Sequence, residues 1–349
     1  MEKFNNVAID LDSIQTICIN CCGLVGDVFI RVPIIEVLRQ KFKKAKIITI
    51  VDPKAFNVLE NQACIDKIVV YDRNKKPRLN YVKNFVKIIL LLRERKIDLV
   101  VDLYSGGTSA AISKLICKRY RLGFANTKRL RKANNILVES PKFCGQWSQE
   151  FGKILLPLGI SHTQVRKSAS YTCHQGSIES AKKYLKNYNA KYIVINLGTG
   201  AVRKNWPVDN FVKLMIKLNN EYGYMPLVIT NPSMEQLAVD FEQQYKAHAE
   251  LIRLPILSLN EVGAFMLLSD FVITGDTSLM HVSFGLKRPT LVLFTHTVPE
   301  WHLTEDCACE ACFNPDSTNI NHCGVPWGKN DLKIEYVYQQ FEKLKQKLV

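Results

Sequence analysis

Residues 271–281, FVITGDTSLMH, and the apolar run at 290–294 decide the fold class that this sequence predicts. The segment holds a short apolar strand, a turn with an acid, a hydroxyl and an imidazole, the start of a helix, and then a second strand. In an open α/β sheet, ligands bind outside the carboxyl ends of the strands, where backbone N–H groups at a helix N-terminus hold anions. The segment therefore predicts half of a site for a phosphate or a nucleotide sugar.

Strand-like and helix-like segments alternate along both halves of the chain. Apolar, β-rich runs predict strands at 16–20, 47–51, 67–71, 98–103, 192–197, 225–230, 271–273 and 290–294. Helical spacing of apolar residues predicts helices at 33–42, 82–95, 207–218, 235–245, 260–268 and 334–348, with Pro33 near a helix start. This alternation favours parallel βαβ units. We expect an α/β chain of two Rossmann-like, doubly wound domains, residues 1–172 and 173–349, that face each other across a cleft.

Positive charge is concentrated in the first domain. The chain has a formal net charge of +15, and residues 1–172 hold 30 Lys and Arg against 14 Asp and Glu. This asymmetry points to an anionic partner of that domain, which could be nucleic acid, an anionic membrane surface or a phosphorylated substrate. A surface solvated by lysine is the alternative. Aromatic and basic residues are not interleaved as in single-strand binding platforms, so we expect no nucleic acid partner.

The ends and the cysteines suggest a cytoplasmic protein. Residues 1–6 lack the basic start and apolar stretch of a signal peptide, and the longest apolar run, 88–92, is too short to span a bilayer. Eleven cysteines in such a chain argue against a disulfide framework. Near the C-terminus, the spacing of Cys307, Cys309, Cys312 and Cys323, with His322 beside the last, is compatible with a structural zinc or iron site held by Cys309, Cys312 and Cys323. Reduced thiols in a loop are the alternative.

Three turns carry residues suited to binding an anion or accepting a proton. Asp27 follows the first strand beside a helix N-terminus, where it would stay ionised and could accept a proton, or could simply cap the helix. In the loop 198–207, two glycines and the pair Arg203 and Lys204 suit a diphosphate. In the opening segment, Asp276 could bind sugar hydroxyls, and Thr277 with the N–H groups of Ser278 and Leu279 could hold a phosphate.

Local structural roles are the alternatives for these residues. Asp276 or Thr277 could cap the helix, and His281, about one turn into that helix, could be a core histidine rather than a ligand-binding one. Trp206 is expected to pack in the core rather than stack on a base.

In their order along the chain, these motifs resemble one enzyme family. Matching segments are VGDV at 25–28 with Pro33, Leu38 and Phe42, CIDKIVVYD at 64–72, IDLVVDL at 97–103 with RLGF at 121–124, KNWP at 204–207 and GDTSLMH at 275–281. They resemble the lipopolysaccharide heptosyltransferases of glycosyltransferase family 9, inverting enzymes with the two-domain GT-B fold. The resemblance extends from Thr16 to the C-terminus.

The resemblance implies transfer of heptose from ADP-heptose to the inner core of lipopolysaccharide, with no cofactor required and no metal at the active site. By that likeness Asp27 is the base. The donor set implied by the motifs comprises Thr199, Arg203, Lys204, Glu235, Asp276, Thr277, Ser278 and His281. Among them, Lys204 would contact the donor phosphates, and Glu235 the ribose.

The resemblance also implies partners for the basic first domain. The phosphates and carboxylates of an anionic acceptor, met at the cytoplasmic face of the inner membrane, would bind Arg119, Arg121, Lys128, Arg129, Arg131 and Lys132. Two departures from the family pattern, Ser278 in place of glycine and Gly-Thr-Gly at 198–200 in place of Pro-Gly-Ala, leave the donor sugar open. A related transferase with another donor or a protein hydroxyl acceptor, or a catalytically degenerate binding protein, remains the alternative.

Overall fold

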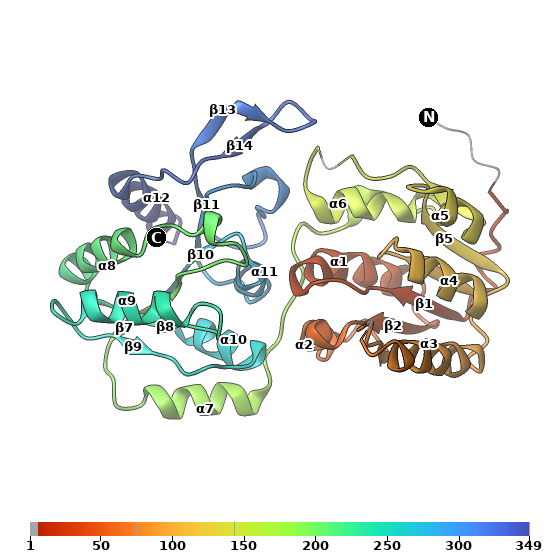
Figure 1. Cartoon of the computed structure of the whole chain (residues 1–349), viewed down its shortest axis with the longest axis horizontal. Helices are drawn as coiled ribbons and strands as arrows, with labels where there is room; N and C mark the ends of the chain where they lie inside the picture. Colours follow the sequence, from red (N-terminus) through yellow and green to blue (C-terminus); the bar gives the residue numbers. More distant parts are fainter. Residues whose placement is uncertain (1–5, 75, 143, 349) are drawn as a thin grey trace. The chain divides into compact units, whose positions relative to one another are not determined.

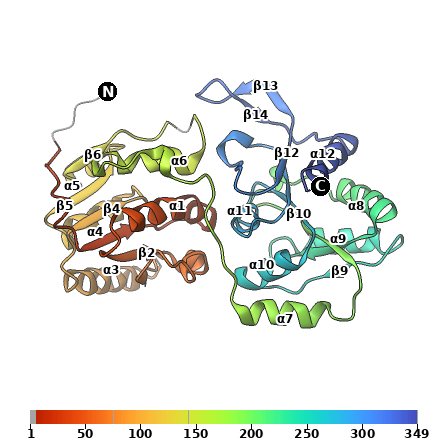
Figure 2. The same ribbon diagram turned by 180° about the vertical axis from the view of Figure 1, so that it is seen from behind.

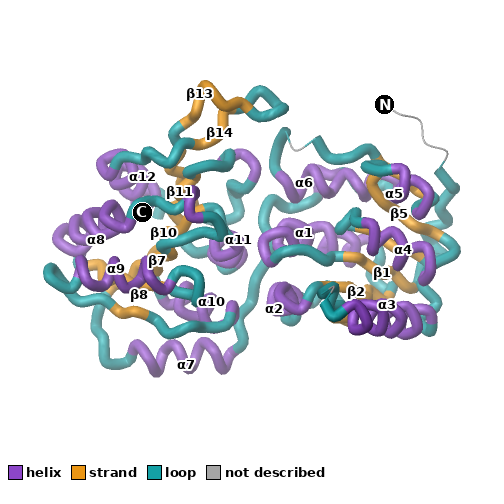
Figure 3. The backbone as a smooth tube through the Cα atoms, in the orientation of Figure 1, coloured by secondary structure: helices purple, strands orange, loops and turns teal. Residues whose placement is uncertain are grey.

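The computed structural model describes residues 6–74, 76–142 and 144–348, so the residues 1–5 considered above lie outside it. The chain divides into two compact units, one ending at Ala169 and the other beginning at Ser170 (Figure 1). In each unit, strands lie between helices (Figure 3). The described part contains no helix that is both long and apolar enough to cross a membrane.

The first unit is built on a parallel six-stranded sheet of order β3-β2-β1-β4-β5-β6. Its strands are β1 (Thr16–Asn20), β2 (Lys46–Val51), β3 (Lys67–Val70), β4 (Leu99–Asp102), β5 (Tyr120–Phe124) and β6 (Ile136–Val138). Its helices are α1 (Val25–Lys41), α2 (Phe56–Leu59), α3 (Arg78–Arg93), α4 (Gly107–Ile116), α5 (Lys128–Ala133) and α6 (Trp147–Gly152). Short 3₁₀ turns occur at η1 (Pro53–Ala55), η2 (Lys153–Leu158) and η3 (His162–Gln164).

Helices cover both faces of this sheet, as its continuous apolar strands require. On one face, Cys18, Ile48 and Val100 pack in a cluster with Ile88 of α3 and Ile112 of α4. Helix α1 packs with α6. Because all six strands are parallel, their carboxyl ends lie at a single edge of the sheet, and the turns that follow them meet there.

The second unit repeats this plan in the order β12-β11-β10-β7-β8-β9. Its strands are β7 (Lys191–Asn196), β8 (Tyr224–Ile229), β9 (Ile252–Arg253), β10 (Phe271–Gly275), β11 (Thr290–Phe294) and β12 (Cys309–Phe313), and β13 (Pro315–Ile320) pairs with β14 (Pro326–Gly328) in a separate antiparallel ribbon. Its helices are α7 (Gln175–Leu185), α8 (Val208–Tyr222), α9 (Glu235–Tyr245), α10 (Leu259–Leu268), α11 (Ser278–Gly285) and α12 (Ile334–Gln346), with 3₁₀ turns η4 (Val202–Lys204) and η5 (Pro299–Trp301). Helices α7 and α10 lie side by side in Figures 1 and 2.

The predicted α/β fold class with two Rossmann-like sheets is confirmed, and two local predictions are wrong. Helix α1 begins at Val25, directly after the turn, so Pro33 lies inside it rather than near its start. Leu348 lies beyond the end of α12 and is half-exposed, whereas Val337, Phe341 and Leu344 form the buried stripe of that helix. The helical spacing of apolar residues continues to Leu348, although α12 ends at Gln346.

The aromatic contacts of α12 predict its contribution to stability. The Phe341 ring is fully buried and lies 4.8 Å from that of Phe271 and 6.1 Å from that of Tyr224. We expect Phe341→Ala to lower the free energy of unfolding by about 3–5 kcal/mol, because it leaves a cavity in this core. Leu348→Ala, on an exposed side chain, should change it by less than about 0.5 kcal/mol. Urea unfolding of both variants checks this, and equal effects would contradict it.

Candidate functional site

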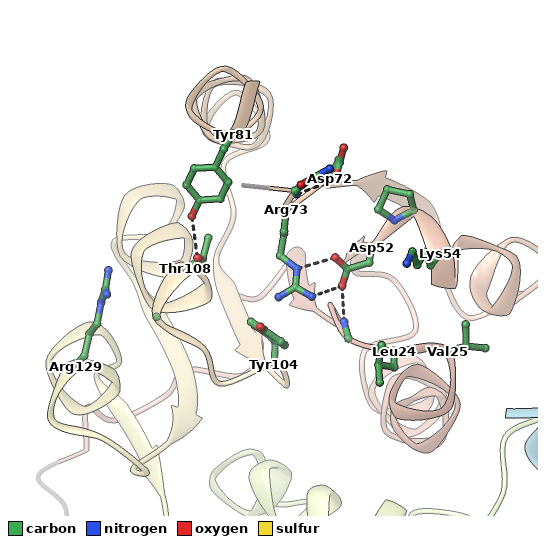
Figure 4. Close-up of a pocket in the computed structure, with 14 residues that line it drawn as sticks. Leu24, Val25, Asp52, Lys54, Asp72, Arg73, Tyr81, Tyr104, Thr108 and Arg129 are labelled. Carbon is green, nitrogen blue, oxygen red and sulfur yellow. Dashed lines mark hydrogen bonds and ion pairs between the residues drawn. The ribbon is translucent and has the colours of Figure 1, made fainter. Parts of the chain in front are cut away.

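The turns after β1, β2, β3 and β4 surround a cavity of about 1080 Å³ in the first unit (Figure 4). Each strand contributes residues just beyond its carboxyl end, as expected for a doubly wound sheet. The lining residues are Gly23, Leu24, Val25, Asp52, Pro53, Lys54, Asp72, Arg73, Asn74, Tyr81, Tyr104, Gly107, Thr108 and Arg129. Their charged groups suit a polar, anionic ligand.

An arginine held in a fixed position forms part of this cavity wall. Arg73 donates from Nε to Asp52 Oδ1 and from its terminal nitrogen to Asp52 Oδ2, both at 2.7 Å. Its guanidinium also lies 4.2 Å from the centre of the Tyr104 ring (Figure 4). The backbone N–H of Gly23 donates to the same carboxylate at 2.6 Å. A bidentate pair stacked on an aromatic ring holds a cation in one orientation.

Asp27 occupies the first turn of α1, two residues after the lining residue Val25. Its Oδ2 accepts a hydrogen bond from the N–H of Leu24 at 3.1 Å, so the residue does help to cap the helix. A carboxylate has further acceptor positions beyond this one. At Gly23, where φ is +151°, a Cβ would lie 3.1 Å from Asp27 Oδ2 and 2.9 Å from an Arg31 nitrogen. Glycine therefore permits the close approach of this turn to the carboxylate.

The six basic residues predicted for an acceptor are not gathered at one place. Only Arg129 lines the cavity. Arg121 donates to three backbone carbonyls, those of Ala133, Lys118 and Cys117, at 2.6, 3.0 and 3.1 Å. Among the others, Arg131 donates to the carbonyl of Ala125, Arg119 forms ion pairs with Asp10 and Asp98, and Lys128 and Lys132 are exposed on α5.

Sequence reasoning did not select Lys54 and Arg73, which the structure places at the cavity. Both had the signal that was used for Asp27, since each is close behind the end of a predicted parallel strand. The sequence prediction instead selected basic residues at 119–132, where positive charge is dense. Position after a strand is the better guide in this fold.

In the second unit, Asp276 directly follows β10 and contacts side chains from three other segments. Its Oδ2 accepts from Thr297 Oγ1 at 2.7 Å and lies 4.0 Å from Lys204 Nζ. Its Oδ1 is 3.7 Å from His302 Nε2, and the rings of His302 and His281 are 5.4 Å apart. An acid, an ammonium group and two imidazoles therefore share one small region.

The surroundings determine which of these groups are charged. Burial by itself raises the pKa of Asp276, but His302, Thr297 and Lys204 outweigh it and hold the pKa below its usual value. Burial, with a smaller contribution from His302, lowers the pKa of His281 to about 3. Burial also lowers the pKa of His302, against the opposing effect of Asp276. Near neutral pH, Asp276 is therefore a carboxylate and the His281 imidazole is neutral.

Thr277 is the N-cap of α11, which is the local role given above as the alternative to phosphate binding. Its Oγ1 accepts from the N–H of Leu279 at 3.2 Å, while the buried Asn196 Nδ2 donates to the same oxygen at 3.3 Å and to Thr274 Oγ1 at 3.0 Å. Ser278 is the first residue of the helix. Asn196 ends β7, so this amide ties the helix start to the neighbouring strand.

Hydrogen bonds hold the loop 198–207, which follows β7, in a fixed conformation. Thr199 N–H donates to Asn205 Oδ1 at 2.7 Å, and Thr295 Oγ1 donates to the carbonyl of Lys204 at 2.5 Å. Arg203 is exposed on η4, and Lys204 is half-buried. Trp206 is buried and donates from Nε1 to the carbonyl of Leu332 at 2.9 Å, which confirms its predicted packing role.

Glu235 lies at a second hollow of the same unit, of about 480 Å³, at the ends of β8 and β9. It forms an ion pair with Arg253 and accepts from Thr230 Oγ1 at 3.2 Å. The hollow is lined by Tyr184, Thr230, Glu235, Glu242, Arg253, Leu254, Pro255 and Ile256. Apolar groups with a few hydrogen-bonding groups in this combination are typical of small-molecule pockets.

The predicted cysteine ligands do not form one set in the part of the chain that the structure describes. Cys309 and Cys312 lie three residues apart on β12, so they point to opposite faces of the sheet. Cys309 packs with Met280 and Phe284, whereas Cys312 belongs to the core on the other face. Cys323 follows β13, in the turn before β14. The expectation of a loop at Cys309 and Cys312 is also wrong, because a sixth strand forms there.

Comparisons with known proteins show the family of this chain. The model of "Glycosyltransferase family 9 (heptosyltransferase)" matches residues 85–311. Lipopolysaccharide heptosyltransferase 3 of Escherichia coli is 22% identical over 280 residues, covering 78% of this chain and 81% of that protein. A family 9 glycosyl transferase from Veillonella parvula DSM 2008 has a similar structure, with a TM-score of 0.80, 19% identity and coverage of 97% of this chain and 99% of that one.

A third similar structure contains a bound nucleotide sugar. The E. coli heptosyltransferase WaaC with ADP-2-deoxy-2-fluoro heptose gives a TM-score of 0.70 at 20% identity, covering 94% of this chain and 99% of that chain. At this identity the likeness establishes the fold, which is the GT-B arrangement of two Rossmann-like domains.

The neutral state of His281 predicts a pH dependence of stability. Its pKa in the folded protein is below the unfolded value of about 6.5, so the neutral ring stabilises the fold fully above pH 6.5 and this contribution is lost as the pH falls. Between pH 6.5 and 4.5, the free energy of unfolding of the parent protein decreases as the pH falls. We expect His281→Gln to make this decrease less steep, by at most about 1 kcal/mol per pH unit. His248→Gln, on an exposed histidine, should leave the profile unchanged. Identical profiles for His281→Gln and the parent would refute the assignment.

Proposed function

We propose a function from the premise that this chain belongs to glycosyltransferase family 9, the heptosyltransferase family. It is a glycosyltransferase, and we propose that it moves heptose from ADP-heptose to the inner core of lipopolysaccharide, by an inverting reaction that needs no metal. The observation that carries this proposal is the convergence of Lys204, Asp276 and the start of α11 at the strand ends of the second unit. A cation and a helix N-terminus beside a sugar-binding carboxylate suit a nucleotide sugar.

In the proposed donor site, each side chain interacts with one part of the donor. Lys204, which Asp276 holds at 4.0 Å, and the exposed Arg203 stabilise the negative charge that develops on the departing diphosphate. Asp276 accepts hydrogen bonds from heptose hydroxyls, because its low pKa keeps it ionised. The neutral His281 has one nitrogen to donate and one to accept.

The remaining donor residues hold the nucleotide and shape the sugar pocket. Glu235 binds the ribose, and the hollow beside it takes the adenine. Thr199 and Thr277, whose hydroxyls already make hydrogen bonds within the protein, position the loop and the start of α11 for the phosphates. Ser278, the first residue of that helix, sets the space available to the donor sugar.

In the proposed transfer, Asp27 is the general base. It takes the proton from an acceptor hydroxyl while that oxygen bonds to the anomeric carbon from the face opposite the diphosphate. The bond from the anomeric carbon to the phosphate oxygen breaks, and ADP leaves with the electron pair. The hydrogen bond from the N–H of Leu24 holds the carboxylate at this turn, and Leu24 itself lines the cavity.

The cavity of the first unit is the proposed acceptor site. Arg129, Lys54 and Arg73 would bind the phosphates and carboxylates of the inner core. Arg121 and Arg131 instead serve the fold, through the backbone carbonyls that they bind. Since the acceptor is linked to lipid, we also propose that the protein meets the cytoplasmic face of the inner membrane, and that nucleic acid is not a partner.

The decisive experiment is mass spectrometry of the core oligosaccharide from cells that lack this protein. We expect the loss of one heptose, restored by the parent gene and not by one encoding Asp27→Asn. Asparagine keeps an oxygen for the N–H of Leu24 but cannot take the proton, so with purified enzyme kcat should fall by about 10²–10⁴ without loss of stability. An unchanged core would refute the proposed donor and acceptor, and full activity of Asp27→Asn would refute the base.

The acceptor site is tested by two neighbouring cations of α5. Arg129 lines the cavity, whereas Lys128 is exposed and does not. We expect Arg129→Gln to raise the KM for the acceptor about tenfold, the effect of losing one charge-assisted hydrogen bond. Lys128→Gln should change that KM less than about twofold. Steady-state kinetics with varied acceptor check this, and equal effects would show that charge alone, rather than the cavity, matters.

A further inference from the structure

Helix α3 exposes an apolar stripe on the side that faces away from the sheet. Its inner side is buried, with Ile88, Ile89 and Leu92 in the core. On its outer side four apolar side chains, spaced three or four residues apart, form one stripe. They are Leu79, 78% exposed, Val82, 49%, Val86, 48%, and Leu90, 57%. A surface helix normally shows polar residues there, so this stripe requires a separate explanation.

Positive charge surrounds the stripe. Helix α3 contains four Lys or Arg and no Asp or Glu. Arg78, Lys83 and Lys87 are exposed on α3 itself. Apolar side chains flanked by lysine and arginine are typical of helices that lie in the interface of an anionic membrane.

The end of α3 extends the same surface. Arg93 Nε donates to the carbonyl of Leu115 at 2.9 Å, which fixes the last turn of α3 against α4. The Leu115 side chain of α4 is itself 41% exposed. Figure 1 shows α3 and α4 next to each other in the first unit.

We propose that the outer face of α3 docks on an anionic phospholipid bilayer, with the apolar stripe entering the boundary between headgroups and acyl chains. The basic flanks would meet the lipid phosphates. A second copy of the chain fits this face less well, because a two-fold contact would bring the basic residues beside the stripe of one copy close to those of the other. This docking face extends the proposed function. It rests on the proposed function only for the identity of the lipid-linked acceptor.

The same helix joins the docking face to the proposed acceptor site. Tyr81 of α3 lines the cavity, and its hydroxyl is 3.1 Å from Thr108 Oγ1 of α4 (Figure 4). A helix that lies on the bilayer thus also forms a wall of the cavity. An acceptor anchored in that bilayer would reach the cavity without leaving the membrane.

Co-sedimentation of the full chain with vesicles tests the docking face. We expect binding to vesicles of phosphatidylglycerol and phosphatidylethanolamine, and at least about tenfold weaker binding to phosphatidylcholine alone. The double variant Val86→Glu and Leu90→Glu should bind the anionic vesicles at least about tenfold more weakly. The matched control is Leu156→Glu, on a side chain 50% exposed in η2 of the same unit, and it should bind like the parent.

A second variant separates the charges from the stripe. Lys83→Gln with Lys87→Gln should weaken binding to anionic vesicles and reduce its dependence on salt, because fewer cations meet the headgroups. Circular dichroism should show the parent fold for every variant, since all the changed side chains are exposed. Transfer to a delipidated, water-soluble acceptor should be unchanged.

Each outcome supports or overturns the docking face. Vesicle binding that Val86→Glu with Leu90→Glu leaves intact would overturn it. A contrary outcome is a parent chain that fails to bind vesicles and forms a dimer in sedimentation velocity that the double variant does not form. That result would overturn the docking face and show a surface for self-association. Vesicle binding as expected, without any heptose transfer to the soluble acceptor, would support the docking face and count against the proposed function.

Discussion

The parallel pairing of neighbouring strands at the middle of each sheet is the constraint on which the rest of this structure depends. In the second unit β7 pairs with β10, and the buried Asn196 at the end of β7 donates to Thr274 and Thr277 around the end of β10. This register brings the loop carrying Lys204 to Asp276, although the two residues are far apart in sequence. In the first unit the pairing of β1 with β4 has the same effect for the turns around the cavity.

The two units use this geometry with different electrostatics. In the second, the carboxylate of Asp276 stays ionised because its neighbours outweigh the effect of burial, and the nearby imidazole of His281 stays neutral. In the first, the cation of Arg73 is held by Asp52 and the Tyr104 ring. A site in which charges are fixed by neighbouring groups needs little reorganisation when charge develops during a reaction, and this is the main requirement for stabilising a leaving diphosphate.

The excess of positive charge in the first half of the sequence serves three different purposes. Arg121 satisfies backbone carbonyls and so stabilises the fold. Arg73 and Arg129 face the cavity. Lys83 and Lys87 are solvent-exposed beside the apolar stripe of α3, where we propose that they meet lipid. A net charge therefore indicates an anionic partner but does not identify which cations meet it.

The sequence by itself determined the α/β class, most of the strands and helices, and the turns that hold Asp27, Lys204 and Asp276. These features depend on local patterns, namely apolar runs, helical spacing and turn residues at strand ends, which can be recognised in a single segment. Only the tertiary structure decided which arginines line the cavity, that Pro33 lies within a helix, that Cys309 and Cys312 point to opposite faces of a strand, and that one side of α3 is exposed. Each of these depends on which segments the topology packs together, because burial and hydrogen-bond partners are properties of the neighbours in space rather than of the neighbours in sequence.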